Sequence, residues 1–238
     1  MVGNFDDDQF GRVMVYTRRG IRRITARWDG DHVKMTVPAG MTLSELKAAL
    51  DRMRDGIGGL KRSTVDYAIG QQLQCFRCQV TIGEQPTATD LFSYGLIDNS
   101  HAYLRVPRAL DMSQENVKRT ISSALQWLME RFALIHLLPF AIEVAQSVGI
   151  TLSKSKLSVG RGMRKLGHCT RSGGNIQLSR NLMFLPEHLI RYVIFHELAH
   201  LQHPDHSPAF HHLVNVYTGG QEAQLEAELK QFAWPIMR

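Results

Sequence analysis

Cysteine is scarce in this chain, and no apolar run is long enough to cross a bilayer. Three cysteines among 238 residues argue against a disulfide framework and suit a reducing compartment. The most apolar stretch, residues 133–145, falls short of the roughly 20 residues that a membrane helix needs and is interrupted by Pro139. The acidic start MVGNFDDDQF lacks the apolar core of a signal peptide. We therefore expect a cytoplasmic protein with no membrane segment.

The sequence also lacks internal repeats, low-complexity linkers, a glycine-rich phosphate loop and a cluster of carboxylates. The last two absences count against a P-loop nucleotide site and a carboxylate-bound magnesium ion. Cys75 and Cys78 form a CxxC within LQCFRCQVTI, which has the pattern of a strand. No second pair is present to complete a zinc site, so we expect these to be structural thiols.

The overall composition is typical of a soluble globular protein, with 44% hydrophobic and 21% charged residues. We expect a single domain over residues 1–238, rich in strands from about 10 to 110 and helical from about 111 to 238. The net charge of +6 is unevenly spread, because three Lys/Arg stand against six Asp/Glu from Pro186 onward. The basic first half permits contact with a nucleotide or DNA without requiring it.

Alternating apolar residues predict strands near the amino terminus, at RVMVYTRR, IRRITARW and HVKMTVP. The Asp29-Gly30-Asp31 turn favours antiparallel pairing there. Thr42 and Glu45 form a capping box for a helix over residues 43–54, which we expect Gly56 to end. A basic cluster lies on these first strands and their turn: Arg18, Arg19, Arg22, Arg23 and Arg27. It is either a solvated strand face or a contact for nucleic acid or nucleotide phosphates.

The rest of the chain predicts strands followed by helices. Strands are expected around LQCFRCQVTI and AYLRVP, then a helical region over residues 113–149 that bends or breaks near Pro139. KLSVGRGMRKLGHC and NIQLS predict two strands joined by a turn at 172–174. Pro186 fits the first turn of a helix with apolar residues at helical spacing up to Leu201. The pattern indicates an α+β fold, with an antiparallel or mixed sheet packed against the helices.

Residues 196–200 read HELAH, the HExxH motif, in the middle of this predicted helix. Residues four apart share one helical face, so His196 and His200 can converge on one ion. Glu197 stands beside the first of them, where its carboxylate can reach a water molecule on the metal. A catalytic zinc site needs a third protein ligand and an open position.

We expect His206 to provide that third ligand. His203 continues the same helical face, but it lies about 10 Å of helix rise from His196, too far to share an ion already held by His200. Pro204 should stop the helix at His203, so that the chain folds back and presents His206. Ser207-Pro208 can then begin the next helix. The alternatives left open are His211, His212, Glu222 and Glu226.

Two segments of the chain resemble the YgjP-like metallopeptidases, relatives of the SprT and WLM zinc peptidase domains, and the second of them contains His196, Glu197, His200 and His206. The first segment is RRGIRRITARWDGDHVKMTVPAGMTLSELKAAL, and the second runs from Met163 to Phe210. The resemblance implies a zincin-like fold, with His196, His200 and His206 as zinc ligands and Glu197 as the catalytic glutamate. Three departures concern the pocket: KLGHC replaces a sequence that usually reads arginine-tryptophan-glycine-serine-cysteine, Ser179 replaces asparagine, and His211 replaces tryptophan.

Together these patterns and the resemblance predict a hydrolase with one catalytic zinc ion, a metallopeptidase acting on peptides or proteins with Glu197 as general base. His168 and Tyr217 are candidates for contacting the substrate or the developing oxyanion. Two alternatives remain: a metal-dependent nucleoside triphosphate pyrophosphatase, and a SprT-like protease acting on DNA-associated proteins.

Overall fold

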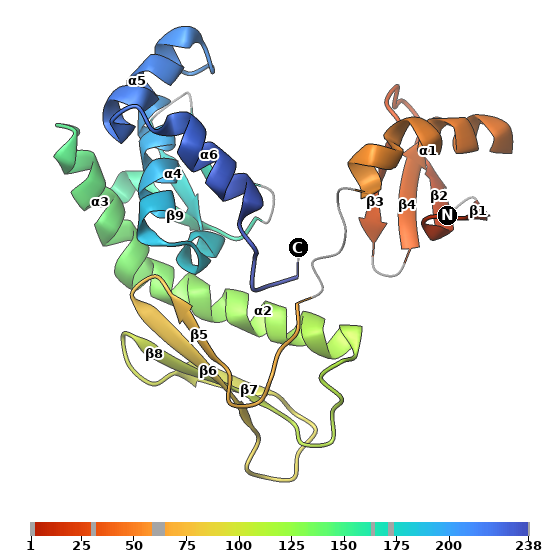
Figure 1. The fold of residues 1–238 in the computed structure, drawn as a ribbon, viewed down its shortest axis with the longest axis horizontal. Coiled ribbons are helices and arrows are strands. Elements are labelled where there is room, and N and C mark those ends of the chain that lie inside the picture. The colour runs from red at the N-terminus through yellow and green to blue at the C-terminus, as the bar shows by residue number, and fades with distance from the viewer. Residues whose placement is uncertain (1–2, 30–31, 59–64, 163–164, 171–173, 238) are drawn as a thin grey trace. The chain divides into compact units, whose positions relative to one another are not determined.

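The chain forms two compact units, residues 1–63 and 64–238 (Figure 1). The structure is a computed structural model that describes residues 3–29, 32–58, 65–162, 165–170 and 174–237. The division falls earlier than the change from strands to helices that we expected near residue 110. That the whole chain forms a single domain stays a prediction. The mixed α+β architecture is confirmed, but the strands form three sheets rather than one.

The first unit is a four-stranded sheet followed by one helix. Its elements are β1 (Gly3–Asp7), β2 (Gly11–Thr17), β3 (Thr25–Asp29), β4 (His32–Val37) and α1 (Leu43–Gly58), with strand order β1-β2-β4-β3. β3 pairs antiparallel with β4, as the Asp-Gly turn predicts. β2 pairs parallel with β4, so the antiparallel prediction is wrong for this strand. The reason is that residues 18–24 cross to the far side of β4 before the chain turns back.

The core of the first unit lies between one face of this sheet and α1. Alternate residues such as Val13 and Met35 are fully buried there, together with Leu50 of the helix. The predicted capping box is present: the Thr42 N–H donates to Glu45 Oε2 at 2.8 Å, and the Glu45 N–H donates to Thr42 Oγ1 at 3.3 Å. The helix therefore starts where the sequence indicates, but it runs past Gly56 to Gly58.

The second unit begins with another four-stranded sheet and a long helix. These are β5 (Gln72–Cys75), β6 (Cys78–Glu84), β7 (Ser93–Leu96), β8 (His101–Val106) and α2 (Glu115–Phe132), with strand order β5-β6-β8-β7. LQCFRCQVTI is a hairpin rather than one strand, since Cys75 pairs with Cys78 across a two-residue turn. Arg77 takes φ 56° in that turn. All three cysteines are free, and that they are structural thiols stays a prediction.

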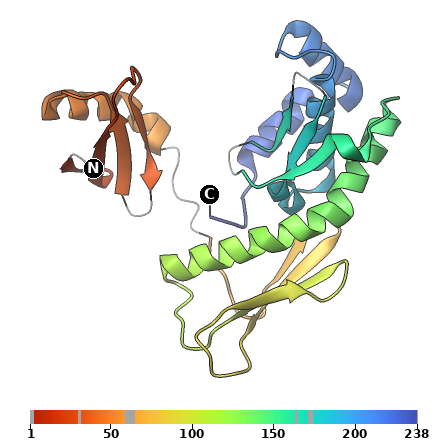
Figure 2. The same ribbon diagram turned by 180° about the vertical axis from the view of Figure 1, so that it is seen from behind.

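The helical region is interrupted near Pro139, as predicted. α2 passes into a π-helical turn, Ala133–Leu137, and α3 (Leu138–Ser147) starts with Pro139 in its first turn. Proline has no N–H to donate and crowds the carbonyl four residues earlier, so the wider turn relieves the clash. α2 packs against β7 and β8 and also against residues 180–184 (Figure 2). Among the described helices, none is both long and apolar enough to span a membrane.

The last part of the second unit carries a small mixed sheet and three helices. Its elements are β9 (Leu157–Gly160), β10 (Gly167–Cys169), β11 (Ile176–Ser179), α4 (Glu187–Ala199), α5 (Pro208–Thr218) and α6 (Glu222–Gln231). The strand predicted at 156–169 is therefore two strands, and β10 is an edge in the order β10-β11-β9. Most of the predicted turn at 172–174 falls outside the described residues. Pro186 is the N-cap of α4 rather than part of its first turn.

Candidate metal centre

The candidate metal centre is built at the carboxyl-terminal end of α4. Most of this helix is buried, because it packs against α3, α5, α6 and the small sheet. His196 lies in its last turn and His200 is its C-cap. Their ring centroids are 4.9 Å apart, as expected for neighbours at i and i+4 on one helical face.

The chain leaves the helix through a tight turn. Regular helix ends at Ala199, earlier than the predicted stop at His203, and the N–H of Gln202 then donates to the Ala199 carbonyl at 3.1 Å. Pro204 follows, where the chain turns back. In this turn the His203 carbonyl lies 3.1 Å from His200 Nδ1 and accepts its proton. This bond directs the other ring nitrogen, Nε2, away from the turn.

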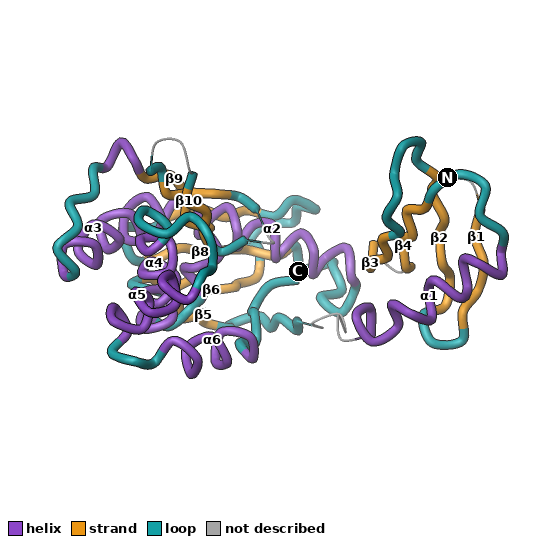
Figure 3. The backbone as a smooth tube through the Cα atoms, turned by 90° about the horizontal axis from the view of Figure 1, so that it is seen from above, coloured by secondary structure: helices purple, strands orange, loops and turns teal. Residues whose placement is uncertain are grey.

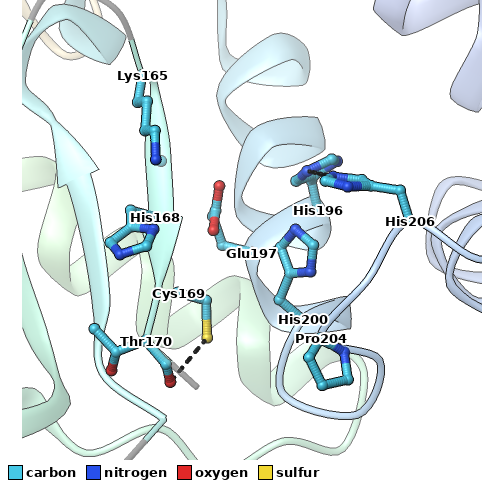
Figure 4. A pocket seen from close by; sticks show the side chains of 10 residues that line it. Lys165, His168, Cys169, Thr170, His196, Glu197, His200, Pro204 and His206 are labelled. Carbon is cyan, nitrogen blue, oxygen red and sulfur yellow. Dashed lines mark hydrogen bonds between the residues drawn. The ribbon is translucent and has the colours of Figure 1, made fainter. Parts of the chain in front are cut away.

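The returning chain brings His206 back to the helix (Figure 4). His206 Nε2 lies 3.2 Å from His196 Nε2, and one ligand atom from each of His196, His200 and His206 lies within 4.8 Å of the others. Two nitrogens bound to one tetrahedral zinc at 2.0–2.1 Å would be about 3.3 Å apart. The His196–His206 spacing is close to that value, and the three imidazoles together could hold one metal ion.

A buried phenylalanine supports all three imidazoles. The Phe210 ring centroid lies 4.8, 4.5 and 4.9 Å from those of His196, His200 and His206, and its side chain is 0% exposed. Phe210 comes from the first turn of α5, directly after the N-cap Ser207 and Pro208. Our sequence analysis gave Phe210 no role, although it belongs to the quoted family segment.

The imidazoles of the helix are in the form that binds metal. Burial, followed by the nearby histidines, lowers the pKa of His196 to about 4. Burial likewise lowers the pKa of His200. Both rings are therefore neutral near pH 7, and each has a lone pair for a cation.

The carboxylate of Glu197 is held inside the protein beside these rings. It is 5% exposed, and its Oε2 atom has no hydrogen-bond partner among the described residues. Burial raises the pKa of Glu197 to about 7, while the charge of Lys165 and a hydrogen bond from the Cys169 backbone N–H act in the opposite direction. A buried polar atom without a partner is rare, and here it fits the need to bind a water molecule.

Glycine at position 167 is required to make room for this carboxylate. A Cβ atom on Gly167 would lie 2.3 Å from Glu197 Oε1. The backbone hydrogen bonds between β10 and β11 are made by residues that alternate with Gly167 and Cys169. The Leu166 carbonyl accepts from the Ser179 N–H, and the Thr170 N–H donates to the Asn175 carbonyl. The backbone groups of Gly167 and Cys169 therefore face the other way.

The sequence analysis did not identify Lys165, Gly167 or Cys169 as site residues. A signal was present, because they correspond to the arginine, glycine and cysteine of the family sequence that KLGHC replaces.

β10 and the end of α4 enclose a pocket of about 470 Å³. Its lining includes Glu197, the three imidazoles and, on the opposite wall, His168 and Lys165 (Figure 4). His168 thus lines the pocket, and its contact with a substrate or oxyanion stays a prediction. Tyr217 is not part of this lining, and its hydroxyl accepts a hydrogen bond from Gln202 at 3.2 Å.

The alternative third ligands do not join the three imidazoles. His211 Nδ1 lies 2.7 Å from Glu222 Oε1, and Asn215 donates to the other oxygen of that carboxylate at 2.9 Å. Glu226 forms an ion pair with Lys230 at 2.7 Å. His212 is exposed on α5.

Comparison with known proteins agrees with this geometry. The family model described as the YgjP-like metallopeptidase domain matches residues 22–232. Neither a search of curated proteins nor a search of solved structures found a match. A metal-dependent hydrolase is what the family model supports, and the pocket contains residues suited to that chemistry. The chain belongs to the YgjP-like metallopeptidase family.

Proposed function

We propose that this protein is a zinc-dependent peptidase whose general base is Glu197. One observation carries the proposal: a buried carboxylate with a free oxygen stands beside three converging imidazoles in an open pocket. Zinc, when bound, supplies a Lewis acid that activates water and polarises a carbonyl group.

In this proposal Glu197 transfers a proton from water to the substrate. Its unpartnered Oε2 can accept a proton from a water molecule in the pocket and return it to the leaving amine. The raised pKa of about 7 suits both steps, because the group neither holds nor releases a proton too firmly near neutral pH. The Cys169 N–H and the close fit against Gly167 hold the carboxylate in place.

The wall opposite the imidazoles supplies candidates for stabilising the developing oxyanion. His168 and Lys165 both line the pocket there and carry N–H donors. We assign this role to His168, on the strand itself. Tyr217 has less support, because its hydroxyl is engaged by Gln202.

A peptide is the substrate that this pocket suits best. β10 is the edge of its sheet and borders the pocket, so an extended chain can lie between this strand and the imidazoles. The carbonyl to be attacked would then lie between Glu197 and His168.

The test compares Glu197→Gln with the wild-type protein. We expect the variant to keep one zinc per chain, measured by elemental analysis, and to lose at least about 10³-fold in kcat/KM on an unstructured peptide library. Glu187→Gln is the matched control, because this glutamate lies in the exposed first turn of the same helix and pairs with Arg191, away from the pocket lining.

Two outcomes would contradict the proposal. One is wild-type peptide cleavage by Glu197→Gln. The other is chelator-sensitive hydrolysis of nucleoside triphosphates that Glu197→Gln abolishes, without any peptide cleavage, which would make a nucleotide the substrate.

A further inference from the structure

The first unit has a sheet face that none of its described helices covers. α1 lies along one side of the sheet (Figure 3), where it packs on residues such as Val13 and Met35. Successive strand residues alternate between faces, so Met14, Tyr16 and Lys34 point to the opposite side. These side chains are only partly buried.

The open face is polar and basic, and it carries an aromatic ring near one end. In the register of the strands, Met14 is beside Lys34, and Lys34 is beside the exposed Arg27. Arg12, also exposed, precedes them on β2, opposite Asp6 of β1. The Lys34 Nζ atom lies 4.5 Å from the centroid of the Tyr16 ring.

Further arginines follow in the connection from β2 to β3. This connection starts directly after Tyr16 and Thr17 and reaches β3 at Thr25, so it lies at the end of the sheet where the tyrosine is. It contributes four exposed arginines: Arg18, Arg19, Arg22 and Arg23. From Gln9 to Trp28 the chain contains six arginines and no acidic residue.

The charge of these six arginines is not balanced by ion pairs within the described residues. None of them forms an ion pair with an acidic residue in the part of the chain that the structure describes. A concentration of arginine without partners carries a positive potential and attracts an extended anion.

A nucleic acid fits this surface better than a membrane does. Membrane-surface binding needs exposed apolar side chains, and the only large one among the described residues of this unit is Leu43, which lies on α1. A sheet face with an aromatic ring among basic side chains instead offers stacking for a base and contacts for phosphates.

We propose that the open face of the β1–β4 sheet, together with the arginines of residues 18–27, binds single-stranded nucleic acid. The arginines contact the phosphates, and a base displaces Lys34 from the Tyr16 ring and stacks there. A duplex keeps its bases paired and cannot stack in this way, so the surface prefers single strands.

Fluorescence anisotropy of the full chain with a labelled single-stranded 20-mer, as DNA and as RNA, tests the proposal between 50 and 200 mM salt. A quadruple variant, Arg12→Gln, Arg22→Gln, Arg23→Gln and Arg27→Gln, should bind at least about tenfold more weakly and show a smaller salt dependence. Tyr16→Ala should bind about tenfold more weakly with the salt dependence unchanged, because stacking releases no counterions.

The matched control changes charge on the other side of the unit. Lys47 and Arg52 are exposed on α1, so Lys47→Gln with Arg52→Gln should leave binding within twofold. Circular dichroism of each variant checks that it is folded. Glu197→Gln should bind like the wild-type protein, so the result does not depend on the proposed peptidase activity.

Three results would overturn the proposal. They are no binding of the wild-type protein at 50 mM salt, equal losses in the control and quadruple variants, and stronger binding of a duplex or of anionic phospholipid vesicles than of the single strand.

Discussion

The two four-stranded sheets of this protein share one topology but present different surfaces. In both, the outer strands pair antiparallel with their neighbours, the two central strands pair parallel, and a helix follows. On the open face of the first sheet Lys34 lies beside Arg27. The corresponding face of the second sheet also carries a cation over an aromatic ring, with Arg105 5.0 Å from the Tyr103 ring centroid, but Gln74 and Gln79 on that face are neutral and hydrogen-bonded at 2.7 Å. The topology therefore provides a platform, and the side chains decide what it can bind.

The two sheets also differ in what their helices join. α2 continues through the π-helical turn into α3, and both pack in the same core as the metal-binding helix α4. α1 packs in a separate core with its own sheet. The second sheet thus shares a core with the metal-binding helix, whereas the first sheet and α1 form a core of their own. Damage to one core should leave the function of the other intact, and the following predictions test this separation.

The largest effect is expected from truncating Phe210. Phe210→Ala removes a fully buried ring that contacts all three imidazoles, so it should cost about 3–5 kcal/mol in unfolding free energy and weaken zinc binding. Phe10→Ala is the counterpart in the first core, where this ring is 4% exposed. It should lower the stability of the first unit with zinc affinity unchanged. Denaturation measures the unfolding free energy of each variant, and competition with a zinc chelator measures its zinc affinity. A loss of zinc affinity in Phe10→Ala would contradict the independence of the two cores.

A smaller but more specific effect is expected at Gly167. Gly167→Ala places a methyl group 2.3 Å from Glu197 Oε1 and forces the general base out of position. Peptide hydrolysis should fall about 100-fold, with the zinc content retained. Gly83→Ala on β6 is the matched glycine variant, because nothing lies within 4 Å of the added methyl group. Steady-state kinetics should show wild-type activity for Gly83→Ala. Equal losses of activity in both variants would refute the role of Gly167 in positioning Glu197.

The stability of the chelator-treated protein should depend on pH through Glu197. Its pKa is about 7 in the folded chain against an ordinary 4.5, so the protonated form is favoured by folding. This contribution is full below about pH 4.5 and is lost as the pH rises through 7. Glutamine does not titrate, so the free energy of unfolding of Glu197→Gln should exceed that of the wild-type protein by up to about 3 kcal/mol between pH 5 and 8. Urea denaturation at each pH measures the difference, which a flat profile would contradict.

The smallest effect is expected at the capping box of α1. Thr42→Ala removes the hydroxyl that accepts the Glu45 N–H and should cost about 1 kcal/mol, confined to the first unit. Hydrogen exchange should show faster opening of α1, with the protection of α4 and the peptidase activity unchanged. Faster exchange in α4 as well would show that the two cores unfold together.

Features that depend on near neighbours in the chain could be predicted from the amino-acid sequence. The capping box, the break at Pro139 and the turn around Pro204 follow from backbone chemistry within a few residues. Helical spacing predicts that His196 and His200 lie together. The approach of His206 to them follows from the end of the helix before Pro204. That stop came earlier than Pro204 alone predicts, because the last turn tightens at Ala199.

Which distant segments meet could not be predicted in this way, because it depends on how the whole chain packs. The parallel pairing of β2 with β4 depends on where residues 18–24 cross, and hydrophobic alternation is the same for either strand direction. The packing of Gly167 against Glu197 joins β10 to α4 across the fold, and no local pattern encodes it. Burial, which gives the Glu197 carboxylate its raised pKa, is likewise a property of the assembled core, because desolvation depends on every group packed around the site.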